Sequence, residues 1–271
     1  MKVFAGLLAC VLCLPLSAWG RRGHEAVATL ALADLPPEVA AWFRGQEQAL
    51  RDHASEPDHW KRADHKEGPR HYLELEAYGG APVPRDAEAA EALLGPAAFR
   101  KAGQVPWAIL DRVRALSQAL RGGDRAQAAL AASYLSHYVA DLHVPLHTTT
   151  NYDGLATGQK GVHSRWETGL VDRLAGDPEV RPARLEKDLA QAPWAWLQAT
   201  HALVPALLED DRAAAALGGA PGRRGGGGGS YWLVFGKRQG PVVQEQLARA
   251  GQHTAQMILL AWSMAGKPVA P

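Results

Sequence analysis

The residues of this chain that are best suited to chemistry are concentrated between positions 136 and 147. His137 and Asp141 are four residues apart, a spacing that places both side chains on one face of a helix, one turn apart. Pro145 ends that helix, and His147 follows where the chain can fold back. Neutral imidazole and carboxylate groups are the usual nitrogen and oxygen ligands of zinc, so this stretch predicts a zinc site.

A second pair with the same spacing follows, formed by His163 and Glu167. A single pair of this kind is more typical of a helical surface. Two pairs with a third histidine, His147, between them are far more specific for a metal site. The polar, turn-forming segment 148–161 joins the two pairs, as a loop over an open site would.

Three features upstream are uninformative when each is considered alone. Asp58 follows a proline, where an aspartate ordinarily lies in a turn or caps a helix. His71 stands beside Tyr72, as a packed histidine would, and residues 19–24 look like the junction that follows a signal peptide.

Together, these residues resemble the trinuclear-zinc superfamily, which contains the single-strand-specific secreted nucleases and the zinc-dependent phospholipases C. The matching motifs are Trp19-Gly-x-x-Gly-His24, Asp58, His71-Tyr72, His137-x-x-x-Asp141-x-His143-x-Pro145-Leu146-His147 and His163-x-x-Trp166-Glu167. They extend over somewhat more than half of the chain. The residues of these motifs are most similar to those of the bacterial nuclease-type members. Beyond Glu167 the chain matches only as helix.

The resemblance implies three Zn²⁺ ions and assigns a ligand set to each. The first set is Asp58, His71, His137 and Asp141; the second is His147, His163 and Glu167; the third is His24, Asp141 and Trp19, through its amine and carbonyl oxygen. Asp141 would bridge two ions. The free amine of Trp19 exists only after signal cleavage, so export would complete the site.

The resemblance also implies a mechanism in which hydroxide between two zinc ions attacks phosphorus and the remaining zinc neutralises the leaving oxygen. Asp58 could orient that water. Lys61 or Arg62 could hold a phosphate oxygen, although a solvated helix face is the alternative for both. The nucleases carry arginine at the position of Lys61, which offers a point charge and not a bidentate fork.

The implied activity is that of a zinc-dependent endonuclease that hydrolyses phosphodiester bonds of single-stranded DNA and RNA to 5′-phosphate products; 3′-nucleotidase activity is left open. Single-stranded nucleic acid or nucleotides would be the substrate, with no stable protein partner implied. Tyr72 and Glu74 occupy the places where the nucleases present an aromatic and an acidic residue to a base. The alternative is that Tyr72 is core and Glu74 is solvated.

Two other functions compete with the nuclease. A zinc-dependent phospholipase C is favoured by Glu167, where the nucleases usually place aspartate, but the chain has no obvious amphipathic helix with a basic face. A non-catalytic, zinc-stabilised binding protein would have closed sites rich in thiolate or histidine, whereas these sites are carboxylate-rich.

The elements that must position these residues are expected to be helices. Apolar residues recur at helical spacing, and no run of alternating strand segments is present. The expected helices are 22–35, 38–46, 107–120, 125–142, 163–174, 194–208 and 242–264. The fold prediction is therefore all-α, a single compact multi-helix domain over residues 19–271 with a trinuclear zinc cleft. Residues 218–230 are too glycine-rich to pack, and a disordered surface loop is favoured over a mobile basic lid.

Composition restricts the location and the kinds of partner. Residues 1–18 have a basic start, an apolar stretch and small residues before Trp19, which predicts a signal peptide and a secreted or periplasmic protein. A lipoprotein signal ending at Cys10 is the less favoured alternative. Both cysteines lie within this segment, and no other stretch is long and apolar enough to span a membrane. A net charge of +1 argues against a broad basic surface for duplex nucleic acid.

The remaining histidines are expected outside the metal set. His143 would face away from His137 and Asp141 and take a structural or supporting role. Surface or helix-capping positions are expected for His53, His59, His65, His201 and His253.

Overall fold

Helices account for the regular structure of this chain in the computed structural model, which describes residues 19–174, 176, 178–185, 187–219 and 228–271. Within these ranges the only strand-like pairing is an isolated bridge between Leu73 and Gly103. The prediction of an all-α fold is confirmed. The predicted signal peptide, 1–18, and most of the glycine-rich segment lie outside the described residues.

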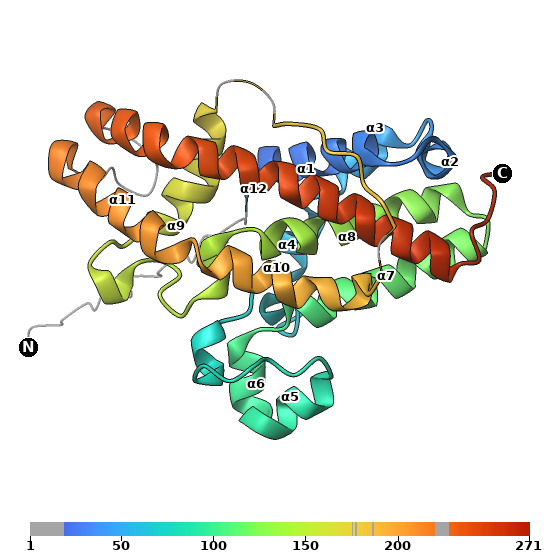
Figure 1. Cartoon of the computed structure of the whole chain (residues 1–271), viewed down its shortest axis with the longest axis horizontal. Coiled ribbons are helices and arrows are strands. Elements are labelled where there is room, and N and C mark those ends of the chain that lie inside the picture. Colours follow the sequence, from blue (N-terminus) through green and yellow to red (C-terminus); the bar gives the residue numbers. More distant parts are fainter. Residues whose placement is uncertain (1–18, 175, 177, 186, 220–227) are drawn as a thin grey trace, which may run out of the picture.

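Four long helices form the frame of the molecule (Figure 1). They are α1 (Gly20–Asp34), α7 (Val105–Arg121), α8 (Arg125–Leu142) and α12 (Gly229–Met264). Helix α12 runs along the length of the molecule and packs on the other three. Because α8 lies against α1, α7 and α12, its side chains are buried along most of its second half.

Helix α8 has the bounds that its sequence predicts, and the reasons are local. Asp124 caps its start, accepting a hydrogen bond from the backbone N–H of Gln127 (3.0 Å). Its alanine-rich first turns favour helix. The helix ends at Leu142, shortly before Pro145, which cannot continue it. This buried, rigid helix carries both His137 and Asp141.

Two predicted helices have wrong bounds, for opposite reasons. The helix expected at 242–264 begins at Gly229 and continues through Pro241, because packing against α11 (Val204–Gly218) and α1 outweighs the lost backbone donor. The helix expected at 194–208 is two helices, α10 (Ala192–His201) and α11, since Pro205 begins a new helical turn.

Two other predicted helices change character along their length. Residues 163–174 form a short α-turn, α9 (Val162–Ser164), then the π-helical turn η6 (Arg165–Leu170), then the 3₁₀ turn η7 (Val171–Arg173). Inserted π-turns are often found at functional sites. Residues 38–46 form α2 (Pro37–Ala40) and the 3₁₀ turn η1 (Ala41–Phe43) and stop there.

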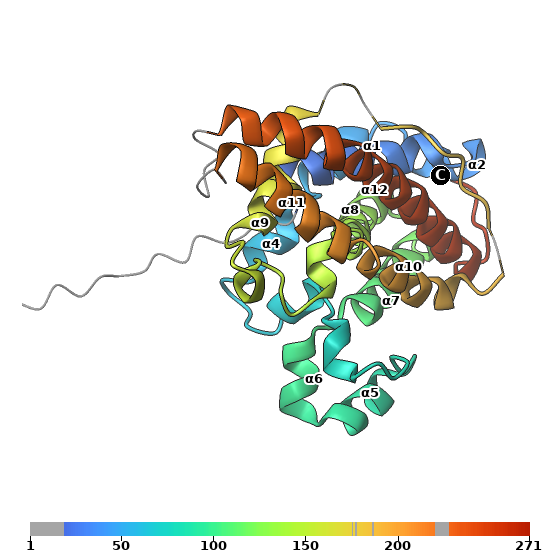
Figure 2. The same ribbon diagram turned by 60° about the vertical axis from the view of Figure 1, so that its left-hand side comes forward.

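Several short helices were not predicted, because each is only one or two turns long. Before α7 these are α3 (Glu47–Asp52), α4 (Glu56–Trp60), η2 (Gly68–His71), η3 (Leu75–Tyr78), α5 (Ala87–Leu94) and α6 (Pro96–Ala102); after α8 they are η4 (Pro145–Thr148), η5 (Leu155–Thr157) and η8 (Leu189–Gln191). Helices α5 and α6 project from the main body in Figure 2, and α6 contacts η2 and η3.

Apolar packing holds the site-bearing elements from two sides. One cluster is centred on α7 and α8, and the other includes Trp19, Trp166, Tyr231 and Phe235. None of the described helices combines the length and apolarity that a bilayer crossing would need.

Candidate metal centre

Three buried groups of histidine and carboxylate side chains are formed by residues of α1 and α8 together with residues of several short helical turns. Their members are His24, His137 and Asp141; Asp58, His71 and His137; and His147, His163 and Glu167. Within each group, one potential ligand atom per residue lies within 4.8 Å of the others. The structure thus brings together the eight expected ligand side chains, which come from segments spread between α1 and η6.

Asp141 connects the groups. Its Oδ2 atom lies 2.7 Å from His71 Nδ1 and 3.2 Å from His137 Nε2. Its Oδ1 atom faces other histidines, at 3.7 Å from His24 Nε2 and 3.9 Å from His147 Nδ1. Because its two oxygens point to different histidines, this carboxylate is placed to serve two cations at once.

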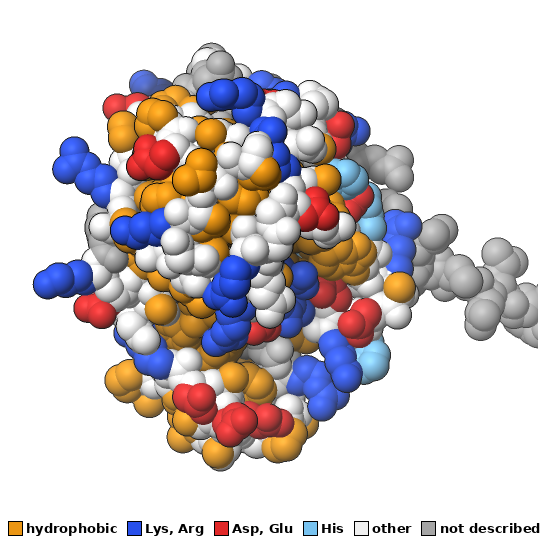
Figure 3. All heavy atoms as spheres, turned by 90° about the vertical axis from the view of Figure 1, so that its right-hand side faces the viewer, with side chains coloured by type: hydrophobic (Ala, Val, Ile, Leu, Met, Phe, Trp, Pro, Cys, Tyr) orange, Lys and Arg blue, Asp and Glu red, His pale blue; other side chains and the backbone are white. Residues whose placement is uncertain are grey.

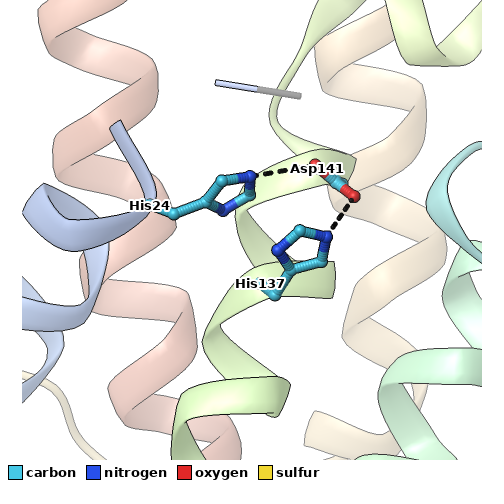
Figure 4. A group of neighbouring side chains, drawn as sticks. All are labelled: His24, His137 and Asp141. Carbon is cyan, nitrogen blue, oxygen red and sulfur yellow. Dashed lines mark ion pairs between the residues drawn. The ribbon is translucent and has the colours of Figure 1, made fainter. Parts of the chain in front are cut away.

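Figure 4 shows how α1 and α8 contribute to one of the groups. His24 comes from α1 and reaches across to the two α8 residues, and its ring stacks on that of His137 with centroids 4.1 Å apart. The four-residue spacing of His137 and Asp141 puts both on the face that meets α1, as the sequence predicts.

The group at η6 takes one residue from each of three short helical turns, with His147 from η4, His163 from α9 and Glu167 from η6. His163 Nε2 lies 2.9 Å from Glu167 Oε2, and His147 Nε2 lies 3.6 Å from the same oxygen. All three side chains are buried. Burial favours the neutral form of Glu167, but the adjacent His163 and His147 lower the pKa of its carboxyl to about 2.

The hydrogen bonds of His71 and His137 determine which of their ring nitrogens face the site. His137 Nδ1 donates to the carbonyl of Ala54 (2.8 Å), and His71 Nε2 lies 3.1 Å from Glu67 Oε1. The other nitrogens, His71 Nδ1 and His137 Nε2, lie 3.0 Å apart, and both are within 3.2 Å of Asp141 Oδ2. A positive charge, carried by a proton or by a metal ion, would satisfy both nitrogens and the carboxylate.

The pKa shifts of His137 and Asp141 also indicate that the site favours positive charge. Burial alone would lower the pKa of His137, but the Asp141 carboxylate beside it raises that pKa. Burial works against ionisation of Asp141, yet its contacts with His137 and His71 hold its pKa well below the usual range. Protons and metal ions compete for the same ligand atoms, so a site that attracts protons in this way is suited to cations.

Some buried polar atoms of the centre make no hydrogen bond within the described part of the chain. Asp58 Oδ2, Asp141 Oδ1 and His147 Nδ1 are buried and make no hydrogen bond to any described part of the chain. Leaving such groups unpaired is costly, and a coordinated cation would satisfy all three. Nitrogen and carboxylate oxygen without thiolate is a donor set suited to zinc in open sites. The residues present therefore fit zinc.

Asp58 and Lys61 form an ion pair at the rim of the centre. Lys61 Nζ donates to Asp58 Oδ1 (2.7 Å), and the same oxygen lies 3.8 Å from both His71 Nδ1 and His137 Nε2. Asp58 is buried at the N-terminal end of α4, whereas Lys61 lies just beyond that helix and lines the adjoining cleft.

A cleft of about 450 Å³ opens directly onto the centre. Its lining includes His71, His147 and His163 from the buried groups, together with Lys61, Arg62, Tyr72 and Glu74. Burial, then the neighbouring Glu76, raises the pKa of the Glu74 carboxyl. Of the expected catalytic and substrate-binding side chains, Lys61, Tyr72 and Glu74 line this cavity, whereas Asp58 is buried and is connected to it through its ion pair with Lys61.

The segment that carries Tyr72 and Glu74 is fixed on both sides. Leu73 N–H donates to the His147 carbonyl (2.9 Å), and Glu74 N–H donates to the Ala102 carbonyl (2.7 Å). Gly103, at φ +93°, lies so close that a Cβ there would be 2.2 Å from the Tyr72 carbonyl oxygen. The aromatic wall of the cleft is therefore held by tight backbone packing.

Trp19 lies just before α1, and its side chain is fully buried. Its indole Nε1 donates to the carbonyl of Ala140 (2.6 Å), next to Asp141, and its ring packs 5.1 Å from that of Trp166. Its carbonyl oxygen accepts a hydrogen bond from Gly23 N–H (3.2 Å). These contacts hold residue 19 beside the helix turn that carries the central aspartate.

Two sets of residues that support the centre were not predicted from the sequence. Glu67 accepts a hydrogen bond from the Tyr138 hydroxyl and lies against His71, so it orients a residue of the centre. Arg165, between His163 and Glu167, forms a buried ion pair with Asp211 on α11. The spacing of Glu67 and His71 was a usable signal, but nothing in the sequence links Arg165 to a residue 46 positions away.

The histidines outside the centre behave less uniformly than predicted. His143 is buried and faces away from the groups, with Nδ1 2.7 Å from the Val139 carbonyl and Nε2 2.8 Å from His253 Nδ1. Its supporting role matches the prediction. His253 was expected at the surface, but it is half-buried and stacked on Trp196 at 3.9 Å. Burial lowers the pKa of His253 to about 2.

Comparison with known proteins decides the family. The sequence profile of the S1/P1 nucleases matches residues 19–200. The chain belongs to this family. The resemblance stated from the sequence is therefore confirmed, and this member of the S1/P1 nuclease family is a nuclease-type hydrolase.

Other comparisons add less. No curated protein matches the chain. Among solved structures, the crystal structure of Clostridium perfringens alpha-toxin, from an avian strain, is similar at a TM-score of 0.49 and 13% identity. The match covers 91% of this chain and 64% of the toxin chain, so this S1/P1 nuclease family member spans less than two thirds of that protein.

Proposed function

We propose that this chain is a zinc-dependent endonuclease that cleaves phosphodiester bonds of single-stranded DNA and RNA, leaving 5′-phosphate ends. It would act as a secreted or periplasmic enzyme after removal of residues 1–18, with 3′-nucleotidase activity on nucleotides as a second reaction of the same site. The observation that carries the proposal is the position of Asp141, whose two oxygens face separate histidine groups beside an open cleft.

Three Zn²⁺ ions would be held by the three buried groups, with Asp141 shared. When bound, they would supply Lewis acidity toward a phosphoryl group and an acidified water. Asp58, which already contacts His71 and His137, would accept a proton from an attacking water or fix its orientation. The same residue holds Lys61 at the cleft by an ion pair, so Lys61 is placed to bind a phosphate oxygen.

The substrate base would be recognised by Tyr72 and Glu74, which also line the cleft. Tyr72 presents an aromatic ring that can stack on any base, and Glu74 presents an acceptor for base amino groups. Neither contact can be made to a base inside a duplex, which supports a preference for single strands. On the face drawn in Figure 3, basic and acidic side chains are interspersed, and no continuous basic surface for a duplex is seen.

The N-terminal residue would complete the third zinc site. Trp19 is held beside the α8 turn that carries Asp141, through its bond to the Ala140 carbonyl. If cleavage occurs before Trp19, its new α-amine and its carbonyl oxygen would join His24 and Asp141 as ligands. The Trp19 carbonyl would then exchange its bond with Gly23 N–H for the metal.

A direct test offers the mature, zinc-loaded protein three substrates in parallel. These are a single-stranded oligonucleotide, the same sequence as a duplex, and phosphatidylcholine vesicles. We expect rapid cleavage of the single strand, with 5′-phosphate ends identified by mass spectrometry, and slow cleavage of the duplex. Asp141→Asn should abolish cleavage, and the surface variant Asp172→Asn serves as the matched control. Release of phosphocholine without cleavage of DNA would contradict the proposal.

A further inference from the structure

The loop between the two ligand-bearing segments, residues 149–161, is partly exposed and closely hydrogen-bonded. Thr149 Oγ1 donates to Glu76 Oε1 (2.5 Å), and Thr150 N–H donates to Glu76 Oε2 (3.1 Å). Asn151 Oδ1 accepts from Ala156 N–H (2.9 Å). These bonds tie the loop to η3 and close it on itself, so its backbone conformation is set before any ligand binds.

The second half of the loop is held as closely as the first. Asp153 Oδ1 accepts a hydrogen bond from Gly161 N–H (3.0 Å), and Gly154 N–H donates to the Asn151 carbonyl (2.9 Å). Gly154 has φ +72°, and a Cβ there would lie 2.6 Å from the Gln159 carbonyl oxygen. Tyr152 is therefore carried by a tight turn between two anchored residues.

Tyr152 remains exposed within this well-ordered loop. Its side chain is 42% exposed. Its ring lies edge-on to that of His163, with centroids 6.0 Å apart at 74°, and it lines the cleft over the metal centre. An aromatic face held in water at the mouth of a site is available to a planar ligand.

The same cleft is also lined by Tyr72. Tyr72 comes from the segment that follows η2, and Tyr152 comes from the loop that follows η4. Two aromatic side chains held by separate, rigid backbone segments form a preorganised pair of walls.

The charges of the cleft favour a nucleotide over a cationic head group. Lys61 and Arg62 line it beside Glu74, so an incoming phosphate meets two cations. A quaternary ammonium would also find aromatic faces, but it would meet those same cations. A base attached to a phosphodiester satisfies both the aromatic and the basic part of the lining.

We propose that Tyr152 is a specificity-determining residue that stacks on a nucleobase of the single-stranded substrate, facing the Tyr72 and Glu74 wall. This inference rests on the proposed nuclease function and adds a residue to it. Stacking on an aromatic side chain would hold an unpaired base while the adjoining phosphate reaches the metal centre. A paired base has no free face to offer, so Tyr152 would strengthen the discrimination against duplexes.

The test compares variants of Tyr152 on an ordinary single-stranded oligonucleotide and on the same oligonucleotide made of abasic sites. Loss of one stacking contact should raise KM for the ordinary substrate roughly 10- to 100-fold in Tyr152→Ala. Its kcat should change little, because binding is lost equally before and during reaction. Tyr152→Phe keeps the ring and should behave as wild type, and cleavage of the abasic substrate should be equal in all variants.

Leu155→Ala is the matched control, since Leu155 is 64% exposed in the same loop and does not line the cleft. It should leave both substrates unaffected, and the zinc content of every variant should equal that of wild type. Equal losses on ordinary and abasic substrates, or a loss of zinc, would mean that Tyr152 only supports the loop and would overturn the inference.

The outcomes separate this inference from the proposed function. A wild-type enzyme that cuts no single-stranded DNA refutes the proposed function, and the inference with it. A wild-type enzyme that cuts DNA while Tyr152→Ala retains its KM refutes the inference alone. If Tyr152→Ala impairs only the hydrolysis of phosphatidylcholine, the ring binds a quaternary ammonium and the inference is wrong.

Discussion

Replacing Asp211 by alanine should destabilise the protein and loosen one part of the metal centre. Asp211 lies on α11 and is buried against Arg165, whose Nε and Nη2 atoms lie 3.0 and 2.9 Å from Asp211 Oδ1. Gln159 Nε2 donates to its other oxygen (2.8 Å), and the Tyr231 hydroxyl donates to Oδ1. The aspartate therefore joins η6, which carries Glu167, to the C-terminal helices.

The expected size of the effect follows from burial. Without Asp211, the Arg165 guanidinium stays buried and loses its counter-charge, a change that costs about 3–5 kcal/mol. Folded proteins are typically stable by only about 5–15 kcal/mol, so the variant should unfold at a clearly lower urea concentration. Tyr231→Phe removes the hydroxyl that donates to the same carboxylate and accepts from Arg165 Nε, but it keeps the ion pair and should cost less, about 1–3 kcal/mol.

Unfolding should be measured in urea with a chelator present and again with zinc present, alongside the zinc content of each variant. Arg165 stands between His163 and Glu167, so Asp211→Ala should also retain less zinc than wild type while Tyr231→Phe retains it all. A loss of stability under about 1 kcal/mol in Asp211→Ala would refute the reasoning. Equal zinc retention would restrict the role of the pair to stability.

Three further predictions concern other parts of the fold. Burial raises the pKa of Asp34 to about 6, so the native state should lose stability as pH rises from about 4 through 6. Asp34→Asn should remove that dependence and should be more stable than wild type above pH 6 by up to about 3 kcal/mol. Urea unfolding at several pH values would show both effects. Glu67→Ala should weaken zinc binding about 10- to 100-fold by freeing the His71 ring, whereas Glu67→Gln should recover part of the affinity. The affinities would be measured by competition with a chelator. A zinc affinity of Glu67→Ala equal to that of wild type would contradict the role of Glu67. A single residue added before Trp19 should remove the third ion and most of the activity, and full activity with full zinc content would exclude an N-terminal ligand.

The sequence predicted the centre better than the supports around it. His137 and Asp141 share a face because helical periodicity is a local property, and α8 begins and ends where Asp124 and Pro145 place it. The pairing of these residues with His24 and His71 depends on how distant segments pack. Those contacts were expected only through resemblance to a family whose members share the motif order.

The C-terminal third shows why the remainder could not be predicted. Pro241 ordinarily ends a helix, yet α12 continues through it because packing against α1 and α11 favours a continuous helix. No motif in the sequence includes Asp211 or Tyr231, and only the tertiary fold brings them to Arg165. Pairs at such long range leave no local pattern.

The central claim is that the buried histidine and carboxylate groups form three zinc sites that share Asp141. Elemental analysis of the purified mature protein, after dialysis against metal-free buffer, tests this claim most directly. About three zinc ions per chain should be found in wild type and in the surface control Asp172→Asn, and Asp141→Asn should hold fewer. One zinc ion or none in the wild-type protein would contradict the account.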